Sequence, residues 1–276
     1  MNGKLPYSLR IHNRRVLVPV GEECTFGCRY CYTRTSEVFN GDIDVSAILD
    51  GIKALNPNDY DIIELGYDGD PLASKSRFFA LGPPLALLGK HLNISTKGTA
   101  TDPTTRDWLR HLVDISNWSG GGLSALVSVC CWSSASIVEP NTPSPAKRLR
   151  FGNWLTKELG VPYFLALRPV LPGVTDEELR AVIRKARRYQ AKGVVAGPLY
   201  VDVAGTFMRW NSNSFDHSEP APIPWAPVNL NWRRIENPSR LDMLVTYASS
   251  LGVPFFTASV DAIRTVMPVT SHGISH

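Results

Sequence analysis

The sequence contains no apolar run that approaches the roughly 18 residues needed to cross a membrane. Its first residues, which include Lys4 and Pro6, lack the apolar core of a secretory signal peptide. It also has no internal repeat and no low-complexity tract. These absences argue against a membrane protein, a secreted protein and a repeat protein. We therefore expect a cytoplasmic protein without a membrane partner.

The charge imbalance is small: the chain has 29 Lys and Arg residues and 25 Asp and Glu residues, which gives a net charge of +4. A mildly basic chain is compatible with a nucleotide or nucleic-acid substrate but does not require one. The chain has 276 residues, of which 43% are hydrophobic and 20% charged. This is an ordinary globular composition, and the length suffices for one large α/β domain.

Histidine and cysteine are scarce, with six and five residues respectively. The histidines are scattered and form no H-x3–5-H pair of the kind found in zinc sites. Three of the cysteines nevertheless fall within eight residues, as C-x3-C-x2-C at Cys24, Cys28 and Cys31. Clustered cysteines in a chain of this size do not resemble the disulfide framework of a small secreted domain.

Thiolates are soft ligands that suit iron–sulfur clusters and zinc. A structural zinc ion needs four closed ligands, whereas a cubane cluster held by three cysteines leaves one iron open. The remaining cysteines are the adjacent pair Cys130 and Cys131, which cannot by themselves hold a second cubane. The cysteine run therefore favours one iron–sulfur cluster. A structural zinc site and an iron–sulfur protein without a catalytic role remain the alternatives.

The cysteine run, followed by Tyr32, resembles the signature of the radical S-adenosylmethionine (SAM) enzymes. This resemblance implies a [4Fe–4S] cluster whose open iron binds SAM. It also implies reductive cleavage of SAM to a 5′-deoxyadenosyl radical, which abstracts hydrogen from an organic substrate. The partners would be an electron donor such as flavodoxin or ferredoxin and a small-molecule or nucleotide substrate. A nucleic-acid base and a specialised metabolite both remain open as substrates.

Short apolar runs alternate with helical stretches, which is the rhythm of a parallel α/β sheet. Six β/α units fit a partial (β/α)6 TIM-like barrel of the radical SAM type, with the chemistry at the C-terminal ends of the strands. The cysteine run follows the first strand and so should lie at that end. The strands are expected at residues 15–20, 61–65, 91–96, 123–131, 163–167 and 194–203, and the helices at 44–55, 78–89, 104–113, 145–159 and 176–190.

Local signals fix some of these boundaries. Asp44 is a suitable N-cap, and Gly160 is a suitable C-terminal stop. Pro83 and Pro84 are expected to interrupt the helix that contains them.

The rhythm breaks at residues 204–238, which are rich in Asn, Ser and Pro and contain three tryptophans. Long loops of this kind are usually functional, and we expect a substrate lid. A last unit follows, with helix 239–251, strand 253–257 and helix 260–266. We therefore expect a core barrel over residues 1–203, and a lid loop with a short C-terminal βα extension, packed on the same domain, over 204–276.

Further segments resemble the spore photoproduct lyase and DNA repair photolyase-like branch of this superfamily. They are a T-K step at Thr96-Lys97, an E-P…R-L element from Glu139 to Leu149, and a P-x-x-P-G element from Pro169 to Gly173. The resemblance spans about residues 16–203. It implies that Lys97 and Arg148 contact the SAM carboxylate or its neighbourhood.

The same resemblance implies further SAM contacts. The loop after the second strand would accept the SAM ammonium through Asp70 or Asp68 and its carbonyls. Ser128 would touch the ribose or methionyl part, and the 193–198 segment would offer adenine a backbone edge. The full set of expected cofactor contacts is Gly66, Asp68, Asp70, Ser95, Lys97, Ser128, Arg148 and Gly197.

One departure from that branch concerns the hydrogen donor. Where spore photoproduct lyase carries a cysteine in the loop after the second strand, this chain has Tyr67. A phenol can donate a hydrogen atom, and Cys130 or Cys131 is a second candidate. Buried cysteines, however, usually act as small hydrophobes. The absence of a cysteine at the Tyr67 position puts true spore photoproduct lyase activity in doubt.

Cationic and aromatic side chains of the expected lid are candidates for binding a phosphorylated or aromatic substrate by charge and stacking. An ordinary loop rim is the alternative. The candidates are Arg209, Trp210, Trp232, Arg233 and Arg234.

Overall fold

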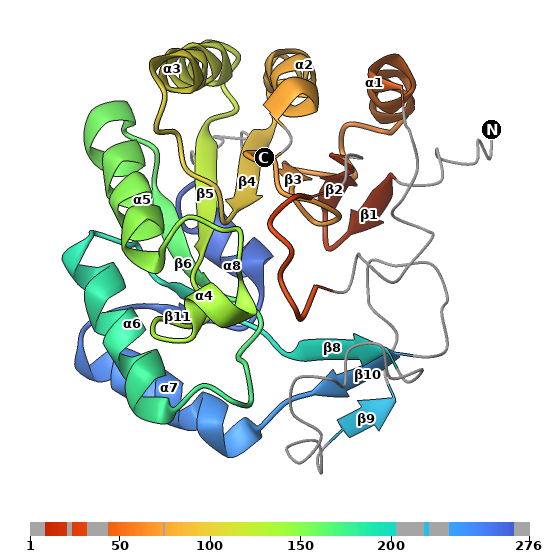
Figure 1. Cartoon of the computed structure of the whole chain (residues 1–276). Helices are drawn as coiled ribbons and strands as arrows, with labels where there is room; N and C mark the ends of the chain where they lie inside the picture. The colour runs from red at the N-terminus through yellow and green to blue at the C-terminus, as the bar shows by residue number, and fades with distance from the viewer. Residues whose placement is uncertain are drawn as a thin grey trace, which may run out of the picture.

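A curled eight-stranded sheet forms the centre of the molecule (Figure 1). The computed structural model describes residues 9–20, 24–31, 44–73, 75–202, 218–220 and 232–267. The spatial order is β1-β2-β3-β4-β5-β6-β7-β11, with β1 antiparallel to β2 and every other neighbouring pair parallel. The predicted partial barrel is thereby confirmed. The strands are β1 Arg10–His12, β2 Arg15–Val18, β3 Ile62–Leu65, β4 His91–Thr96, β5 Leu123–Ser128, β6 Tyr163–Leu167, β7 Val194–Ala196 and β11 Phe255–Phe256.

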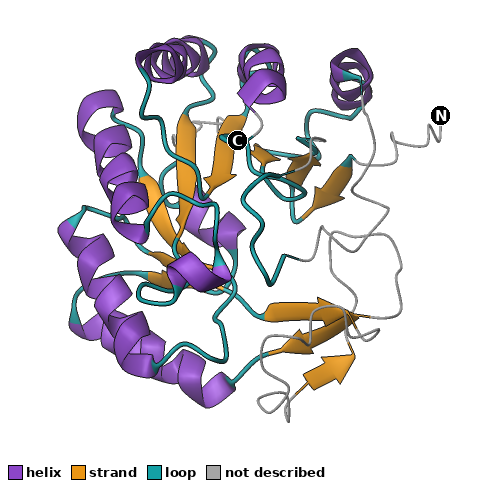
Figure 2. Cartoon of the chain, viewed as in Figure 1, coloured by secondary structure: helices purple, strands orange, loops and turns teal. Residues whose placement is uncertain are grey.

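Helices cover the outer face of this sheet (Figure 2). Asp44 accepts a hydrogen bond from the Ser46 N–H at the start of α1, and Gly160 ends α5 with a φ of 67°. Both signals had been predicted. The helices are α1 Val45–Lys53, α2 Lys75–Ala86, α3 Pro103–Trp118, α4 Ala135–Val138, α5 Pro145–Leu159, α6 Asp176–Arg188, α7 Pro238–Ser250 and α8 Ser259–Arg264.

The two faces of the strands carry different side chains, because successive residues point to opposite sides. On β4, Leu92 and Ile94 join the apolar core beneath the outer helices. His91 and Asn93 alternate with them, are equally buried, and bond to the Ser124 hydroxyl of β5. The outer layer is therefore apolar, while the concave face of the sheet carries buried polar groups.

The last helix, α8, lies on the concave face of the sheet. Its Ala262 packs against Phe164 and Val195 of β6 and β7, and its Ile263 packs against Ile62 of β3. Because these strands lie far apart along the sheet, α8 fills the part of the barrel interior between them. The expected C-terminal extension thus adds both a strand, β11, and an internal helix.

Several predicted boundaries were wrong. One continuous α2 contains both Pro83 and Pro84, because the complete burial of Leu81 and Leu85 compensates for the two missing N–H donors. The expected strand 194–203 divides into β7, in the main sheet, and β8 Leu199–Asp202, in a second sheet. Gly197-Pro198 lies at the division. Asp102 caps α3 two residues before the helix predicted at Thr104.

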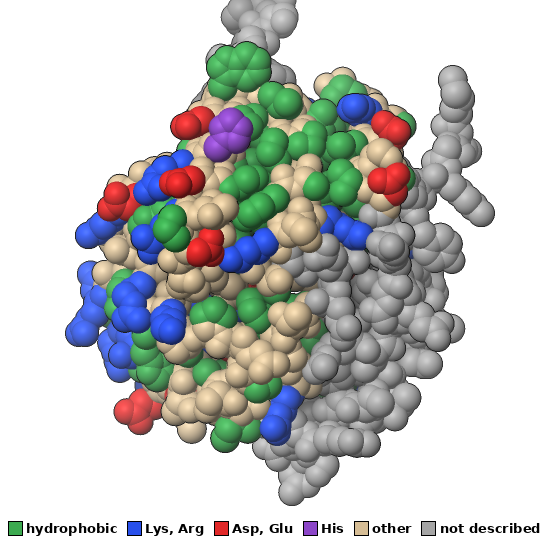
Figure 3. Space-filling view, turned by 45° about the horizontal axis from the view of Figure 1, so that its top comes forward, with side chains coloured by type: hydrophobic (Ala, Val, Ile, Leu, Met, Phe, Trp, Pro, Cys, Tyr) green, Lys and Arg blue, Asp and Glu red, His purple; other side chains and the backbone are tan. Residues whose placement is uncertain are grey.

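The second sheet has the order β8-β10-β9, with β9 at Ser218–Pro220 and β10 at Trp232–Ile235. Most of the expected lid, residues 203–217 and 221–231, lies outside the described residues. No helix among the described residues combines the length and apolarity needed to span a membrane. Lys and Arg side chains gather along one flank of the surface (Figure 3).

Candidate functional site

A cavity of about 400 Å³ opens at the C-terminal ends of the barrel strands and continues into the barrel interior. Its wall includes Cys24, Cys28 and Cys31, together with residues that follow or end β3 to β7. The second sheet and the turn between β11 and α8 complete the wall. The cysteine run therefore lies beside the loops in which the sequence predicted the other cofactor contacts.

The three cysteines are free thiols on the wall of this cavity. Cys28 is buried, and Cys24 and Cys31 are partly exposed. Burial raises the pKa of Cys24 to about 11 and that of Cys28 to about 12. Both side chains are therefore protonated until a metal centre, which deprotonates its thiol ligands, displaces the protons.

The Glu139 segment holds the cysteine run from behind. The Arg29 N–H donates to the Val138 carbonyl at 2.9 Å, and the Asn141 N–H donates to the Phe26 carbonyl at 3.3 Å. The Asn141 amide also donates to the Thr25 carbonyl at 3.1 Å. A segment more than 100 residues further along the chain thus fixes the backbone between the three cysteines.

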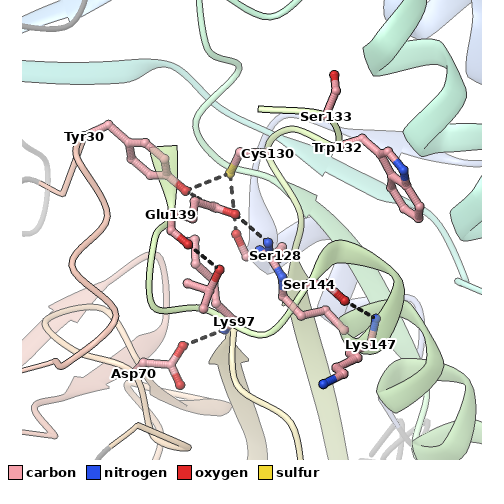
Figure 4. A network of polar contacts seen from close by, with 12 residues as sticks. Tyr30, Asp70, Lys97, Ser128, Cys130, Trp132, Ser133, Glu139, Ser144 and Lys147 are labelled. Atoms are coloured by element: carbon pink, nitrogen blue, oxygen red, sulfur yellow. Dashed lines mark hydrogen bonds and ion pairs between the residues drawn. The ribbon is translucent and has the colours of Figure 1, made fainter. Parts of the chain in front are cut away.

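A buried polar network completes this support (Figure 4). The Tyr30 hydroxyl donates to one oxygen of Glu139, and Arg148 donates to the other at 2.6 Å. Arg148 also donates to the Ser128 carbonyl at 2.7 Å. Arg148 and Glu139 have no exposed side-chain surface, and Arg148 does not line the cavity. Arg148 therefore lies behind the cavity wall, where it supports the cysteine run.

Lys97 lies beside this network and does line the cavity. Its ammonium stands 5.5 Å from the centre of the Tyr30 ring. Burial acts to lower the pKa of Lys97, but Cys130, Cys28 and Glu139 together raise it above its ordinary value. Lys97 is therefore a charged, partly buried donor next to the cysteine run.

The loop after β3 shapes the adjacent wall through Gly66, Tyr67 and Asp70. Gly66 has a φ of 104°, and a Cβ there would lie 2.3 Å from the Ser95 carbonyl oxygen. No other residue fits this position. Asp70 accepts from the Lys97 N–H at 2.5 Å and from the Thr96 hydroxyl at 2.6 Å, so it joins two cavity loops. Burial raises the pKa of Asp70, although these hydrogen bonds oppose the effect.

Other expected cofactor residues divide between the wall and its support. Ser95, Ser128 and Gly197 line the cavity. Asp68 does not; it accepts from the Val20 N–H at 2.8 Å and ties the β3 loop to the chain entering the cysteine run.

The candidate hydrogen donors are placed differently. Tyr67 lines the cavity, whereas Cys130 and Cys131 are completely buried behind its wall. Cys130 donates to the Arg168 carbonyl at 2.9 Å, and its sulfur lies 3.3 Å from the Tyr30 hydroxyl oxygen. The structure thus does not bring the cysteine pair to the cavity surface.

The expected substrate residues also separate. Arg234 lines the cavity, and Arg233, the next residue on β10, does not. Neighbouring strand residues face opposite sides. Arg209 and Trp210 lie outside the described residues, as does the side chain of Trp232.

Sequence reasoning missed a polar wall inside the barrel. Arg15 donates to Glu64 at 2.5 Å and to the Ser259 hydroxyl at 2.5 Å. Arg168 and Tyr200 line the cavity near them. Arg15 and Glu64 sit in strands otherwise rich in apolar residues, and a charged residue in a buried strand was the signal that could have found them.

The donor geometry bears on the kind of metal centre. Among the described residues, no three His, Cys, Asp or Glu side chains converge closely enough to hold a single metal ion. A zinc ion needs its sulfur ligands at about 2.3 Å. Cluster thiolates bind different irons and stand further apart. Three free thiols on one cavity wall are the soft donors that an iron–sulfur cluster takes.

The chain is similar to known proteins in sequence and in fold. The family model described as the radical SAM superfamily matches residues 18–186. No curated protein matches the chain. Spore photoproduct lyase complexed with dinucleoside spore photoproduct is structurally similar, with a TM-score of 0.62 and 12% identity over 87% of this chain and 75% of that one.

Two other solved structures share the fold. Streptococcus suis SuiB bound to S-adenosylmethionine has a TM-score of 0.60 and 9% identity, over 89% of this chain and 50% of that one. A radical SAM methyltransferase from Sphaerobacter thermophilus has a TM-score of 0.58 and 14% identity, over 90% and 67%. Identities this low establish a shared fold and leave the substrate open.

Proposed function

This chain belongs to the radical SAM superfamily of enzymes, which use a [4Fe–4S] cluster and SAM, and we propose that it cleaves SAM reductively to abstract hydrogen from an organic substrate. When bound, the cluster and SAM would supply the radical chemistry. The observation that carries the proposal is the position of the three cysteines on the wall of the 400 Å³ cavity.

The cluster would be held by Cys24, Cys28 and Cys31. Two hydrogen bonds fix the backbone of this run: the Arg29 N–H donates to the Val138 carbonyl, and the Asn141 N–H donates to the Phe26 carbonyl. The Tyr30 hydroxyl anchors it to buried Glu139. A preorganised backbone keeps the three sulfurs in place without further ordering when the cluster binds.

Bound SAM would lie between the cysteine run and the loops after β3, β4 and β7. Lys97 offers a positive charge for the SAM carboxylate, and Ser95 and Ser128 offer hydroxyl groups. Tyr67 is the candidate on the cavity wall for returning a hydrogen atom to a substrate radical. Gly66 allows the β3 loop to approach Ser95 closely.

The test is anaerobic reconstitution with iron and sulfide, followed by reduction, addition of SAM and detection of 5′-deoxyadenosine by mass spectrometry. We expect product from the wild-type protein and none from a variant with Cys24, Cys28 and Cys31 changed to Ala. The matched control is Cys130→Ala/Cys131→Ala, which also loses buried thiols but retains the cysteine run. It should bind four irons and form product.

A colourless protein that takes up one zinc ion would contradict the proposal and favour the structural alternative. A brown wild-type protein that never forms 5′-deoxyadenosine, together with a control variant that also forms none, would favour a non-catalytic cluster.

Two classes of substrate are compatible with this proposal, a nucleic acid and a small molecule. A nucleic-acid enzyme should bind oligonucleotides with an affinity that falls steeply as salt rises. Fluorescence anisotropy at about 50 and 200 mM salt measures this dependence. Absence of binding at the lower salt would favour a small molecule. We further propose a cytoplasmic location and reduction by a flavodoxin or ferredoxin.

A further inference from the structure

One part of the cavity wall has chemistry that SAM binding beside the cysteine run does not use. It consists of Arg168, Tyr200 and Arg234, here named the arginine wall, all of which line the cavity. Arg168 follows β6, Tyr200 lies on β8 and Arg234 lies on β10. Three elements that are distant in sequence thus bring two guanidinium groups and a phenol to one surface.

The pairing of β8 with β10 places two of these residues together. Tyr200 and Arg234 are directly opposite each other in the antiparallel register, so their side chains share one face of the second sheet. The neighbouring pair, Val201 and Arg233, lies on the other face. Val201 and Ile235 pack into the apolar core. The second sheet therefore separates an apolar core face from a polar cavity face.

The third member is close to the other two. Burial raises the pKa of the Tyr200 phenol, while Arg234 and then Arg168 act to lower it. The phenol and both guanidinium groups line the same cavity, so the three side chains share one surface. Arg234 is also ion-paired with Glu236, which orients its guanidinium.

Arg168 is held by the C-terminal unit. It donates to the Thr257 carbonyl at 3.0 Å and to the Ser259 hydroxyl at 3.5 Å. Thr257 lies in the turn between β11 and α8, and Ser259 is the first residue of α8. Since α8 is packed against the concave face of the sheet, this turn is a fixed support for the arginine.

Gly197 makes room for Arg168. A Cβ at this position would lie 2.9 Å from the Arg168 Nε and 3.1 Å from its Cγ. The backbone of Gly197 has no positive φ, so contact with Arg168, and not backbone strain, is what requires glycine here. The sequence suggested that the 193–198 segment offers adenine a backbone edge, and the structure also places Gly197 against an arginine.

From this arrangement we propose that the arginine wall binds an oxyanion of the substrate, a phosphate ester or a carboxylate. Guanidinium groups bind both oxyanions through paired N–H donors, and the Tyr200 hydroxyl adds a further donor. SAM carries one carboxylate, and Lys97 beside the cysteine run already offers it a cation. The arginine wall is therefore available to a second anion. This inference rests on the proposed function for its assignment to the substrate.

The test measures binding of two probe anions, inorganic phosphate and acetate, by calorimetry at constant ionic strength. It uses reconstituted protein with and without SAM. We expect Arg234→Gln and Arg168→Gln each to weaken binding about tenfold, which corresponds to about 1.4 kcal/mol. Arg233→Gln is the matched control, because it removes the same charge one residue away on the other face. It should bind like wild type.

Gly197→Ala tests the support of Arg168, and it should weaken binding severalfold because the added methyl group displaces the guanidinium. Phosphate binding without acetate binding would identify a phosphate ester, and the reverse would identify a carboxylate. Because Arg234 is exposed, we expect Arg234→Gln to fold like wild type. The test therefore holds even if Arg168→Gln is unstable.

Three results would overturn the proposal. They are no binding of either anion to wild type, equal losses in Arg233→Gln and Arg234→Gln, and loss of anion binding when SAM is added. The last would assign the wall to SAM. Since binding is measured without turnover, the anion site and SAM cleavage can each fail while the other holds.

Discussion

Two arginine–glutamate pairs are buried in this barrel, and their surroundings differ. Arg148 and Glu139 lie behind the cysteine run with 0% of either side chain exposed. Arg15 and Glu64 lie on the cavity wall with 7% and 8% exposed. The first pair is enclosed by protein on all sides, whereas the second borders a space that water or substrate can enter.

The difference shows what each pair does. The Arg148–Glu139 pair connects Tyr30 of the cysteine run to the Ser128 carbonyl at the end of β5. It therefore fixes the geometry of the cysteine run. Arg15–Glu64 connects β2 and β3 to Ser259 of α8, so it fixes the floor of the cavity. Burying an ion pair costs desolvation free energy for both ions. The protein carries this cost at the two places where the pairs shape the site.

The largest effect is expected for Glu139→Gln. Removing this carboxylate leaves Arg148 charged and enclosed, which should lower the free energy of unfolding by about 3–5 kcal/mol. Urea-induced unfolding of the wild-type and variant proteins measures the loss. Tyr30 also loses its charged acceptor, so cluster content after reconstitution should fall.

The double variant Glu139→Gln/Arg148→Met separates the causes. If the uncompensated charge is responsible, the double variant should be more stable than Glu139→Gln alone. A single variant within about 1 kcal/mol of wild type would show that this pair is not the support described, since this is the range of an ordinary hydrogen bond.

A smaller effect is expected for Glu64→Gln, at about 1–3 kcal/mol. Arg15 would also lose an ionic partner, but it keeps the Ser259 hydroxyl and can be hydrated from the cavity. The same urea experiment provides the measurement, with Ser95→Ala as the control because the Ser95 hydroxyl donates to the other Glu64 oxygen at 3.2 Å. A loss equal to that of Glu139→Gln would remove the distinction between the two pairs.

The sequence predicted much of the fold because its local signals agree with the tertiary packing. Strands β4 and β6 and helix α5 have the predicted bounds. In each, a turn signal follows the element, such as Gly160 after α5. The prediction failed where packing outweighs a local rule, as at Pro83 and Pro84, which remain inside α2.

The candidate site was predictable only where residue type and spacing carry the chemistry. The cysteine run has both, and so it was found. Arg148 was expected at the SAM carboxylate because cations suit anions, but its position depends on a carboxylate nine residues earlier, Glu139. Arg15 and Arg168 were missed because their partner Ser259 is separated from them by 244 and 91 residues.

Another buried polar side chain, His91, is accommodated as a neutral group. Its Nδ1 lies 3.2 Å from the Gly121 carbonyl, which can only accept, so Nδ1 carries the proton. Nε2 then accepts from the Ser124 hydroxyl at 2.8 Å. Burial lowers the pKa of His91 from 6.5 to about 4, although the Gly121 carbonyl opposes the shift. This site therefore makes stability depend on mild acid.

The sign follows from proton linkage. Between pH 6.5 and about 4 the unfolded chain binds a proton at His91 that the folded protein does not, so stability falls as the pH falls through this window. From pH 7 to pH 5 the contribution of His91 should be a loss of about 1–2 kcal/mol. Urea unfolding at both pH values measures it, and His91→Gln, which cannot titrate, should lose correspondingly less. Equal losses in the two proteins would mean that His91 is hydrated and charged in the fold, and that the concave face of the barrel tolerates single charges as well as pairs.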